Sequence, residues 1–373
     1  MSLVPTFVLW IPFYLQTVAI WGIPLAKGGM QVVVANYDGP LYLVVAKTLY
    51  EKQAILQNFS FSLPFEYYAA HFPLFPLIIR AIAFVAGYPW GMLVTTLITS
   101  VFAHLMFYKL AREYVKEHHA LWLTLVFALF PARWLIVRSV GSPEPLFIGA
   151  IIACMYYFRK RQYLLAGIFG AIAQFTKSPG ILIFAALVVA IIVPRLHSLA
   201  ITNDVKKWIS NIHPTAIFIG LIPLALLGVF YLYSIKFDNF FAYFNSGDNI
   251  HLFFPPFQIF NYSQPWVSTH WLEEVIFVYL LGAIGLMKLI SQKDWPLASF
   301  VAVFYGVTLF ISHRDLIRYS LPIVPFLIIA YRQELVKREF LVAAAIIVVP
   351  IFLFSFAFIS NNVMPISDWG PLL

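Results

Sequence analysis

A few ionisable residues stand in otherwise apolar stretches, and they are the side chains with which this chain could do chemistry. Asp38 lies within residues 36–40 (NYDGP), where Pro40 is typical of the first turn of a helix. A carboxylate just before a helix stays ionised in the field of the helix dipole and can accept a proton from an attacking hydroxyl. The structural alternative is that Asp38 caps the helix, a common role for Asp at such a position.

Three further polar residues are candidates for the same site. Glu66 and His71 follow Asp38 in the same segment, where they could hold an acceptor or handle a second proton, or could be solvated loop residues. Glu144 begins an apolar stretch, and its alternative role is that of a structural carboxylate at a helix start. These residues are therefore candidates for general acid–base chemistry or substrate binding.

Cations suited to a phosphate group are also present. Arg314 and Arg318 are four residues apart and share a face if the stretch is helical, so the pair could grip a phosphate by charge-assisted bonds. The alternative is contact with lipid headgroups together with an ion pair to Asp315. Lys177 is a lone cation at a turn (TKSPG, residues 176–180), and its alternative role is an interfacial anchor.

Motifs of soluble enzymes are absent from the sequence, which has no phosphate-binding glycine loop, HExxH, GxSxG or Cys/His cluster with metal spacing. Their absence excludes ABC-type ATPases and zinc proteases. No cofactor is expected, and a divalent metal is an open alternative that no motif indicates. The single cysteine, Cys154, excludes an intrachain disulfide.

The composition places these residues in a membrane protein. Of the 373 residues, 62% are hydrophobic and 11% are charged, and the mean hydropathy is +0.86. Soluble domains average roughly 45–50% apolar and about 25% charged residues. A soluble globule, a disordered chain and a nucleic-acid-binding protein are therefore excluded, and we attribute the net charge of +8 to cytoplasmic loops.

We predict an all-α polytopic membrane protein with about eleven transmembrane helices in a single integral membrane domain, residues 1–373, since each span needs roughly 20 apolar residues. His104 lies inside a span and is expected to be a hydrogen-bonded core residue. Two long connections, residues 27–80 and 236–272, are expected to form the active-site side. The first should carry surface helices over 41 to about 53 and 74–87. The predicted spans are 1–26, 81–108, 120–137, 145–158, 162–176, 178–194, 214–235, 275–287, 295–313, 319–331 and 340–367.

The second long connection is rich in aromatic residues, which could stack on a sugar, cover a lipid tail or rest on headgroups as an amphipathic flap. They are Phe253, Phe254, Phe257, Phe260, Tyr262, Trp266 and Trp271.

Loop charge predicts the orientation. Alternate connections hold fourteen Lys and Arg against six Asp and Glu, whereas the rest of the chain holds ten of each. By the positive-inside rule the first set is cytoplasmic, so the N-terminus is inside and the chemistry is outside. The N-terminal span lacks the basic start and cleavage site of a signal peptide and is expected to be a permanent anchor. The cationic connections are 109–119, 159–161, 195–213, 288–295 and 332–339, and the outer cations include Arg133 and Arg138.

Several segments, in order along the chain, resemble motifs of PIG-V-type mannosyltransferases. Residues 37–46 (YDGPLYLVVA) are similar to WDG-x-x-Y/F-L-x-I-A, and residues 71–80 (HFPLFPLIIR) are similar to FFPLYPLLIR. Weaker matches are Phe130-Pro131 with residues 142–147 (SPEPLF) for FP…YSESLF, residues 176–180 for TRSNG, and residues 318–322 (RYSLP) for RF-x-LP. The departures are Tyr37 for Trp, Lys177 for Arg, and Ser142-Pro143 before Glu144.

This resemblance implies a GT-C glycosyltransferase, a multi-span helical protein with surface helices in its first outer loop. Such an enzyme takes a sugar from a polyprenyl-phosphate carrier at the non-cytoplasmic face. The resemblance implies Asp38 as the catalytic acid residue and Glu144 as the acid of the second motif. It implies Lys177 and Arg318 as contacts of the carrier phosphate. The paired DE and DxD signatures of other GT-C branches are missing, which argues against the oligosaccharyltransferase branch and its divalent metal.

We therefore predict an inverting glycosyltransferase that moves a sugar, mannose by resemblance, from a polyprenyl-phosphate carrier to an acceptor hydroxyl. Its partners are the carrier, the bilayer and a glycan, lipid or protein acceptor, with no nucleic acid. A prokaryotic plasma membrane is expected, or the endoplasmic reticulum in a eukaryote. The predicted catalytic residues are Asp38 and Glu144, and the predicted substrate-binding residues are Tyr37, Glu66, His71, Lys177, Arg314 and Arg318.

Two other classes of function are alternatives. One is a secondary transporter of a small or lipid-like substrate, although the internal repeat and the midplane ionisable residues typical of transporters are not seen in the sequence. The other is a non-catalytic membrane protein of envelope assembly, which would not need Asp38.

Overall fold

The computed structural model describes residues 2–61, 63–202, 213–247, 252–261, 263 and 271–373. Within these ranges the regular secondary structure is helical apart from a small antiparallel hairpin of β1 (Ala19–Ile20) and β2 (Ile23–Pro24) and two isolated bridges. The all-α prediction is thus confirmed.

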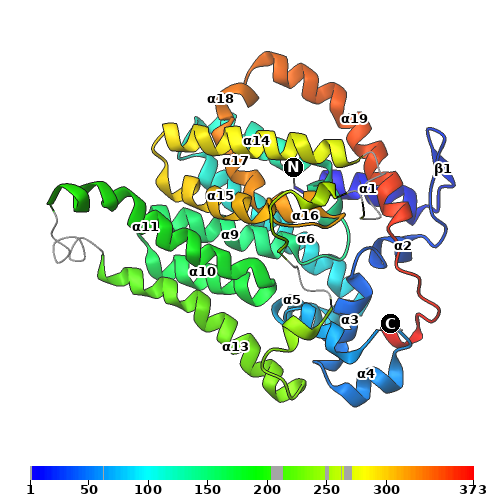
Figure 1. Ribbon diagram of the computed structural model, residues 1–373. Helices are drawn as coiled ribbons and strands as arrows, with labels where there is room; N and C mark the ends of the chain where they lie inside the picture. Colours follow the sequence, from blue (N-terminus) through cyan, green and yellow to red (C-terminus); the bar gives the residue numbers. More distant parts are fainter. Residues whose placement is uncertain (1, 62, 203–212, 248–251, 262, 264–270) are drawn as a thin grey trace.

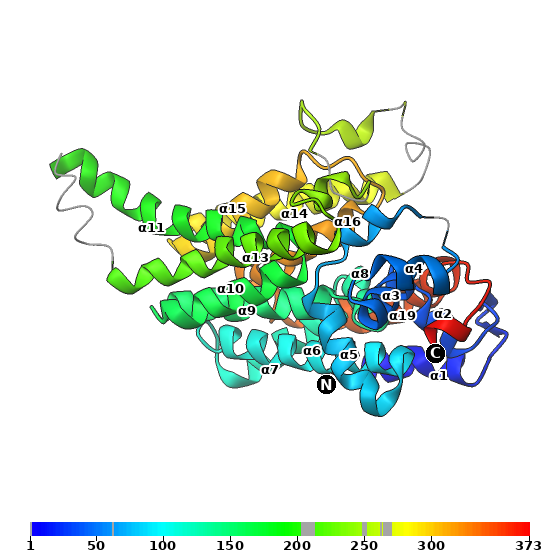
Figure 2. The ribbon, with the colours of Figure 1, turned by 90° about the horizontal axis from the view of Figure 1, so that it is seen from below.

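A layered bundle of helices forms the body of the molecule, and its members run side by side in both views (Figures 1 and 2). Most of these helices are apolar on every face, as expected where each helix is covered by neighbours or lipid. Their shared core contains Phe107, Phe127, Phe300 and Phe326. The members are α6 (Tyr88–Ala111), α9 (Glu144–Arg159), α10 (Tyr163–Thr176), α11 (Ile181–Thr202), α13 (Leu221–Lys236), α14 (Trp271–Ser291) and α15 (Trp295–Thr308).

The first long connection folds into short helices at one end of this bundle (Figure 1). The helix predicted over 41 to about 53 is shorter, because Leu49 and Tyr50 take left-handed backbone angles (φ 49° and 63°) that end it at Thr48. The helix predicted over 74–87 is confirmed. These elements are α2 (Met30–Val34), α3 (Gly39–Thr48), α4 (Lys52–Asn58), η1 (Phe65–Ala70) and α5 (Leu74–Ala86).

Among the described residues, four helices are long and apolar enough to cross a membrane, by length and composition. They are Tyr88–Ala111, Pro214–Lys236, Leu272–Ser291 and Arg338–Asn361. The count of about eleven spans is not confirmed, because several predicted spans are broken. Gly87, at φ 74°, separates α5 from α6, and the segment around Pro131 separates α7 (Glu117–Leu129) from α8 (Ala132–Val137).

The last long helix, α19 (Arg338–Asn361), returns beside α8, and the chain then runs along the first long connection (Figure 1). A bridge between Asn36 and Val363 joins the two segments. The remaining elements are α1 (Val4–Tyr14), η2 (Ser178–Gly180), η3 (Pro214–Gly220), η4 (Ala242–Asn245), η5 (Gln258–Phe260), α16 (Leu316–Ser320), η6 (Leu321–Ile323), α17 (Val324–Ala330), α18 (Arg332–Leu335) and η7 (Gly370–Leu372).

The cationic connections lie together at one end of the bundle, as expected if they are on the same side of the membrane. Asp294 accepts hydrogen bonds from Tyr114 Oη and Arg159 Nη1, both at 2.5 Å, and Lys288 pairs with Glu334 at 2.6 Å. Four of the five cationic connections are joined in this way to at least one other. The fifth, 195–213, lies largely outside the described residues. The side of the membrane that this end faces stays a prediction.

Candidate active site

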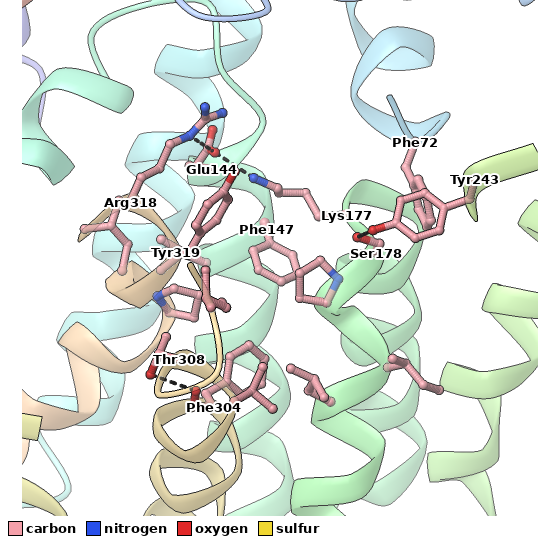
Figure 3. Close-up of a pocket in the computed structure, with 18 of the residues that line it drawn as sticks. Phe72, Glu144, Phe147, Lys177, Ser178, Tyr243, Phe304, Thr308, Arg318 and Tyr319 are labelled. Carbon is pink, nitrogen blue, oxygen red and sulfur yellow. Dashed lines mark hydrogen bonds and ion pairs between the residues drawn. The ribbon is translucent and has the colours of Figure 1, made fainter. Parts of the chain in front are cut away.

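Two cavities meet at the end of the bundle where the first long connection folds. One is a mostly apolar cavity of about 330 Å³, lined by aromatic and aliphatic side chains of α9, α11, α13 and α15 (Figure 3). The other is a polar cavity of about 750 Å³, whose lining includes Asp38, Arg133 and Glu274. Arg318 and Tyr319 line both cavities, so these two residues mark the junction.

A charged cluster closes the polar end of the apolar cavity. Glu144 Oε1 accepts a hydrogen bond from Lys177 Nζ and one from Arg318 Nε, each at 2.7 Å (Figure 3). The hydroxyl of Ser142 contacts the other oxygen, Oε2. These three are the charged residues in the lining of the apolar cavity, and Arg318 Nη1 also lies 3.8 Å from Asp315 Oδ2. Two cations beside an apolar cavity are suited to an anionic headgroup on a greasy tail.

Three separate elements bring this cluster together. Glu144 is the first residue of α9, where the helix dipole favours a carboxylate. Lys177 follows the last residue of α10, and its extended backbone turns the chain into η2. Arg318 comes from α16, more than 170 residues after Glu144, and only 8% of its side chain is exposed. The predicted set of Glu144, Lys177 and Arg318 is therefore assembled in space.

Asp38 lines the polar cavity, and its carboxylate lies 3.9 Å from Arg318 Nη1. It occupies the position before α3, yet its side chain makes no capping hydrogen bond, so the alternative of a helix cap is wrong. Gly39 lets the helix start here, because a Cβ at this residue would lie 2.4 Å from the carbonyl oxygen of Val34. The Asp38 side chain is 30% exposed, which leaves the carboxylate accessible to a substrate.

Arg133 and Tyr37 line the polar cavity together with Asp38. Arg133 Nη1 donates to Tyr37 Oη at 2.8 Å and to Asp315 Oδ1 at 3.0 Å. The Tyr37 ring lies under the Arg318 guanidinium, with the carbon of that group 4.3 Å from the ring centroid. Burial raises the pKa of the Tyr37 phenol, so the phenol stays protonated at neutral pH. The predicted binding residue Tyr37 thus supports Arg318 directly.

The other predicted site residues differ in their placement. His71 is buried next to Tyr42, and burial lowers the pKa of its imidazole, so His71 is neutral at pH 7. Glu66 is exposed and lies outside the lining of both cavities. Arg314 is exposed at the polar cavity but precedes α16, which begins at Leu316. The stretch from Arg314 to Arg318 is thus not one helix, and the condition under which the two arginines would share a helical face is not met.

Two residues considered in the sequence analysis, Arg138 and His104, stabilise the fold. Arg138, predicted as an outer cation, is fully buried, and its Nη1 and Nη2 donate to the carbonyl oxygens of Ser2 and Ala128 at 2.7 and 2.8 Å. His104 is a buried core residue, as predicted, with Nδ1 2.6 Å from the carbonyl oxygen of Ser100. Within the described ranges, no group of three or more His, Cys, Asp or Glu is gathered as metal ligands would be, and the expectation of no cofactor stays a prediction.

The aromatic connection contributes to the apolar cavity. Tyr243 and Phe244 line that cavity, and Tyr243 Oη donates to Ser178 Oγ at 2.8 Å (Figure 3). Phe253 N donates to the carbonyl oxygen of Phe310 at 2.8 Å, which ties this connection to the segment before α16. Tyr262, Trp266 and the side chain of Trp271 lie outside the described residues.

Sequence reasoning missed part of the polar cavity. Arg133 was expected only as an outer cation, and Asp315 only as a partner of the nearby arginines. Asn361 and Asn362 also line the cavity, and no motif in the sequence points to them. Asn362 is held there by a hydrogen bond to Asn36, more than 300 residues earlier in the chain.

No protein-family model matches this chain, and no curated protein matches it by sequence. Among solved structures, the chain is similar to ArnT from Cupriavidus metallidurans bound to undecaprenyl phosphate (TM-score 0.57, 13% identity, covering 92% of this chain and 63% of that one). It is also similar to the archaeal oligosaccharyltransferase AglB from Archaeoglobus fulgidus in complex with an inhibitory peptide and a dolichol-phosphate (TM-score 0.50, 15% identity, covering 99% and 56%).

The fold is thus that of the GT-C glycosyltransferases, to which ArnT and AglB belong, and the GT-C-like prediction is confirmed at the level of the fold. The apo state of ArnT gives a TM-score of 0.55 at 12% identity. The chain spans less than two thirds of the length of each of these proteins.

Proposed function

We propose that this protein is an inverting GT-C glycosyltransferase that moves a sugar from a polyprenyl-phosphate carrier to an acceptor hydroxyl. The observation that carries the proposal is the junction of the two cavities at Arg318, with Lys177 on the apolar side and Asp38 on the polar side. A lipid-linked sugar phosphate has the same order of parts, which are a greasy tail, an anion and a polar sugar.

The donor would bind across this junction. Its isoprenoid tail would occupy the apolar cavity, and its phosphate would lie against Lys177 and Arg318, the two cations in the lining of that cavity. The structures of ArnT with undecaprenyl phosphate and of AglB with dolichol-phosphate support a carrier of this class for the fold. We propose that Glu144 orients the two cations, since its Oε1 accepts a hydrogen bond from each.

Asp38 would act as the general base. It accepts the proton of the acceptor hydroxyl while the hydroxyl oxygen forms a bond to the anomeric carbon and the bond from that carbon to the carrier phosphate breaks. The bonding electrons leave with the phosphate, and Lys177 and Arg318 stabilise the negative charge that develops there. Attack from the side opposite the phosphate inverts the anomeric centre.

We propose mannose as the sugar and a PIG-V-like subtype, which the motifs at residues 37–46 and 71–80 support. A metal is not part of this mechanism, because Lys177 and Arg318 supply the charge that the leaving phosphate needs. The excess of cations on the connections at the opposite end of the bundle supports a non-cytoplasmic location of the site.

The test uses purified protein in liposomes with radiolabelled polyprenyl-phosphate mannose and a native lipid and glycan extract. We expect the wild type to move label from the carrier to the extract and Asp38→Asn to fail. Equal transfer by both proteins would refute the role of Asp38. If the folded wild type leaves mannose and other carrier-linked sugars untouched, the enzyme proposal is wrong, and uptake of label into the vesicles would then favour a transporter.

A further inference from the structure

Five consecutive residues, 361–365, line the polar cavity together with Phe354 and Phe358 of α19. In Figure 1 this segment follows the red helix α19 and passes α2 on its way towards α3 and α4. It lies on the polar side of the junction, away from the lining of the apolar cavity. The segment is thus placed to contact whatever enters the polar cavity to meet Asp38.

Asn36 connects this segment to the part of the chain that carries Asp38. Its side chain is fully buried, and Nδ2 donates to the carbonyl oxygen of Ile359 at 2.8 Å. Its Oδ1 accepts a hydrogen bond from Asn362 Nδ2 at 3.2 Å, and Met364 N donates to the carbonyl oxygen of Ala35 at 2.8 Å. Since Asn36 is two residues before Asp38, these bonds hold the segment at a defined position relative to the proposed base.

The side chains presented here are those that bind hydroxyl groups. Asn361 is exposed, and its Nδ2 donates to the carbonyl oxygen of Ala357 at 2.8 Å. To other described residues, Oδ1 of Asn361 and Oδ1 of Asn362 make no hydrogen bond. Both amides therefore keep acceptor capacity for a ligand. The ring of Phe354, which is exposed, adds an apolar face of the kind on which sugar rings pack, whereas the Phe358 ring is covered by the Arg133 guanidinium.

We propose that Asn361 and Asn362 bind the acceptor and select a polyhydroxylated one, a saccharide, with Asn36 as the residue that positions them. This inference rests on the proposed function and adds the acceptor class to it. A site built from amides rejects an analogue without hydroxyls, because its polar groups would be left unpaired. The charged cluster at the carrier phosphate is not involved in this selection.

The first experiment measures acceptor kinetics in lipid nanodiscs free of sugar detergents, with octyl mannoside, a Ser/Thr peptide and diacylglycerol as acceptors. We expect transfer to octyl mannoside. Asn361→Ala should raise KM for octyl mannoside about fivefold, the effect of losing one neutral hydrogen bond, and change KM for the carrier less than twofold. Transfer to the peptide or diacylglycerol alone would overturn the proposal.

Asn58→Ala is the matched control, because Asn58 is an exposed residue at the end of α4 that donates to the carbonyl oxygen of Ala54 at 2.8 Å, the same local bond as in Asn361. It lies outside the lining of both cavities, so KM for octyl mannoside should not change. An equal rise in both variants, or none in Asn361→Ala, would refute a specific role for Asn361.

A second measurement separates this inference from the proposed transfer reaction. We expect methyl mannoside to slow hydrogen exchange of the backbone amides of residues 358–366 in the wild type, and not in Asn361→Ala. Protection without any transfer would keep the saccharide site and refute the glycosyltransferase. Transfer without protection, and with an unchanged KM in Asn361→Ala, would keep the enzyme and refute the saccharide site.

Discussion

Asp38 and Asp294 lie at opposite ends of the bundle and look alike in the sequence. Each stands directly before a helix, α3 or α15, and each has a proline two residues later, Pro40 or Pro296. A pattern of residue types alone assigns them the same role, that of a helix-start carboxylate.

The structure separates them. Asp294 is 7% exposed, caps α15 through Leu297 N at 3.4 Å, and accepts hydrogen bonds from Tyr114 and Arg159. Asp38 is 30% exposed, caps nothing, and faces a cavity with Arg318 at 3.9 Å. A carboxylate with all its bonds satisfied stabilises the fold, whereas one left open beside a cavity is available for a proton. This difference leads to four predictions.

Replacing Asp38 by Asn should have the largest effect on turnover. We expect about a thousandfold loss of transfer per folded molecule, since a general base contributes roughly 10²–10⁴-fold. The melting temperature should change little, because the carboxylate makes no capping bond and its contact with Arg318 is long, at 3.9 Å. The measurement is the initial rate of label transfer from polyprenyl-phosphate mannose. A loss of less than tenfold in a folded variant would contradict the assignment of Asp38 as the base.

Replacing Asp294 by Asn should show the opposite behaviour. The loss of the ion pair with Arg159 should lower the free energy of unfolding by about 3 kcal/mol, while transfer per folded molecule stays unchanged. Denaturant unfolding in nanodiscs and the transfer rate of the folded fraction measure the two effects. If turnover fell while stability held, the structural role of Asp294 would be wrong.

The fold was predictable where composition and charge carry the information. Apolar helices and the grouping of cationic connections at one end follow from hydropathy and from the positive-inside rule. The end of α3 was not predictable, because Leu49 and Tyr50 take left-handed angles that neither residue type favours. The count of spans is not confirmed, partly because short apolar helices separated by Gly87 or by the segment around Pro131 have the same composition as continuous ones.

The site was predictable only as a set of separate residues. Asp38, Glu144, Lys177 and Arg318 stood out because charge is costly in apolar surroundings. Their geometry did not follow from the sequence, and neither did the role of Arg133, which reaches Asp315 across 182 positions of the chain. Contacts of this kind depend on how whole helices pack, which local patterns do not encode.

The phosphate site provides the third prediction. Lys177→Gln removes one of the two cations of the cluster and should raise KM for the carrier about thirtyfold, the effect of losing one charge-assisted hydrogen bond. Lys177→Arg keeps the charge and should stay within about threefold of the wild type, since guanidinium also binds phosphate. Carrier titrations of the transfer rate measure both. An unchanged KM in Lys177→Gln would place the phosphate elsewhere, and Lys293→Gln, at the opposite end, is the control.

The smallest effect is expected at Tyr37. Tyr37→Phe keeps the ring under the Arg318 guanidinium at 4.3 Å but removes the acceptor of the Arg133 hydrogen bond, so kcat/KM should fall about fivefold. Tyr37→Leu removes the ring as well and should lower kcat/KM further. Because burial raises the pKa of the phenol, Tyr37 does not titrate near neutral pH, and the pH–rate profile of Tyr37→Phe should keep the shape of the wild-type profile. A profile that loses a step in Tyr37→Phe would instead make the phenol a proton donor and weaken the assignment of the base to Asp38.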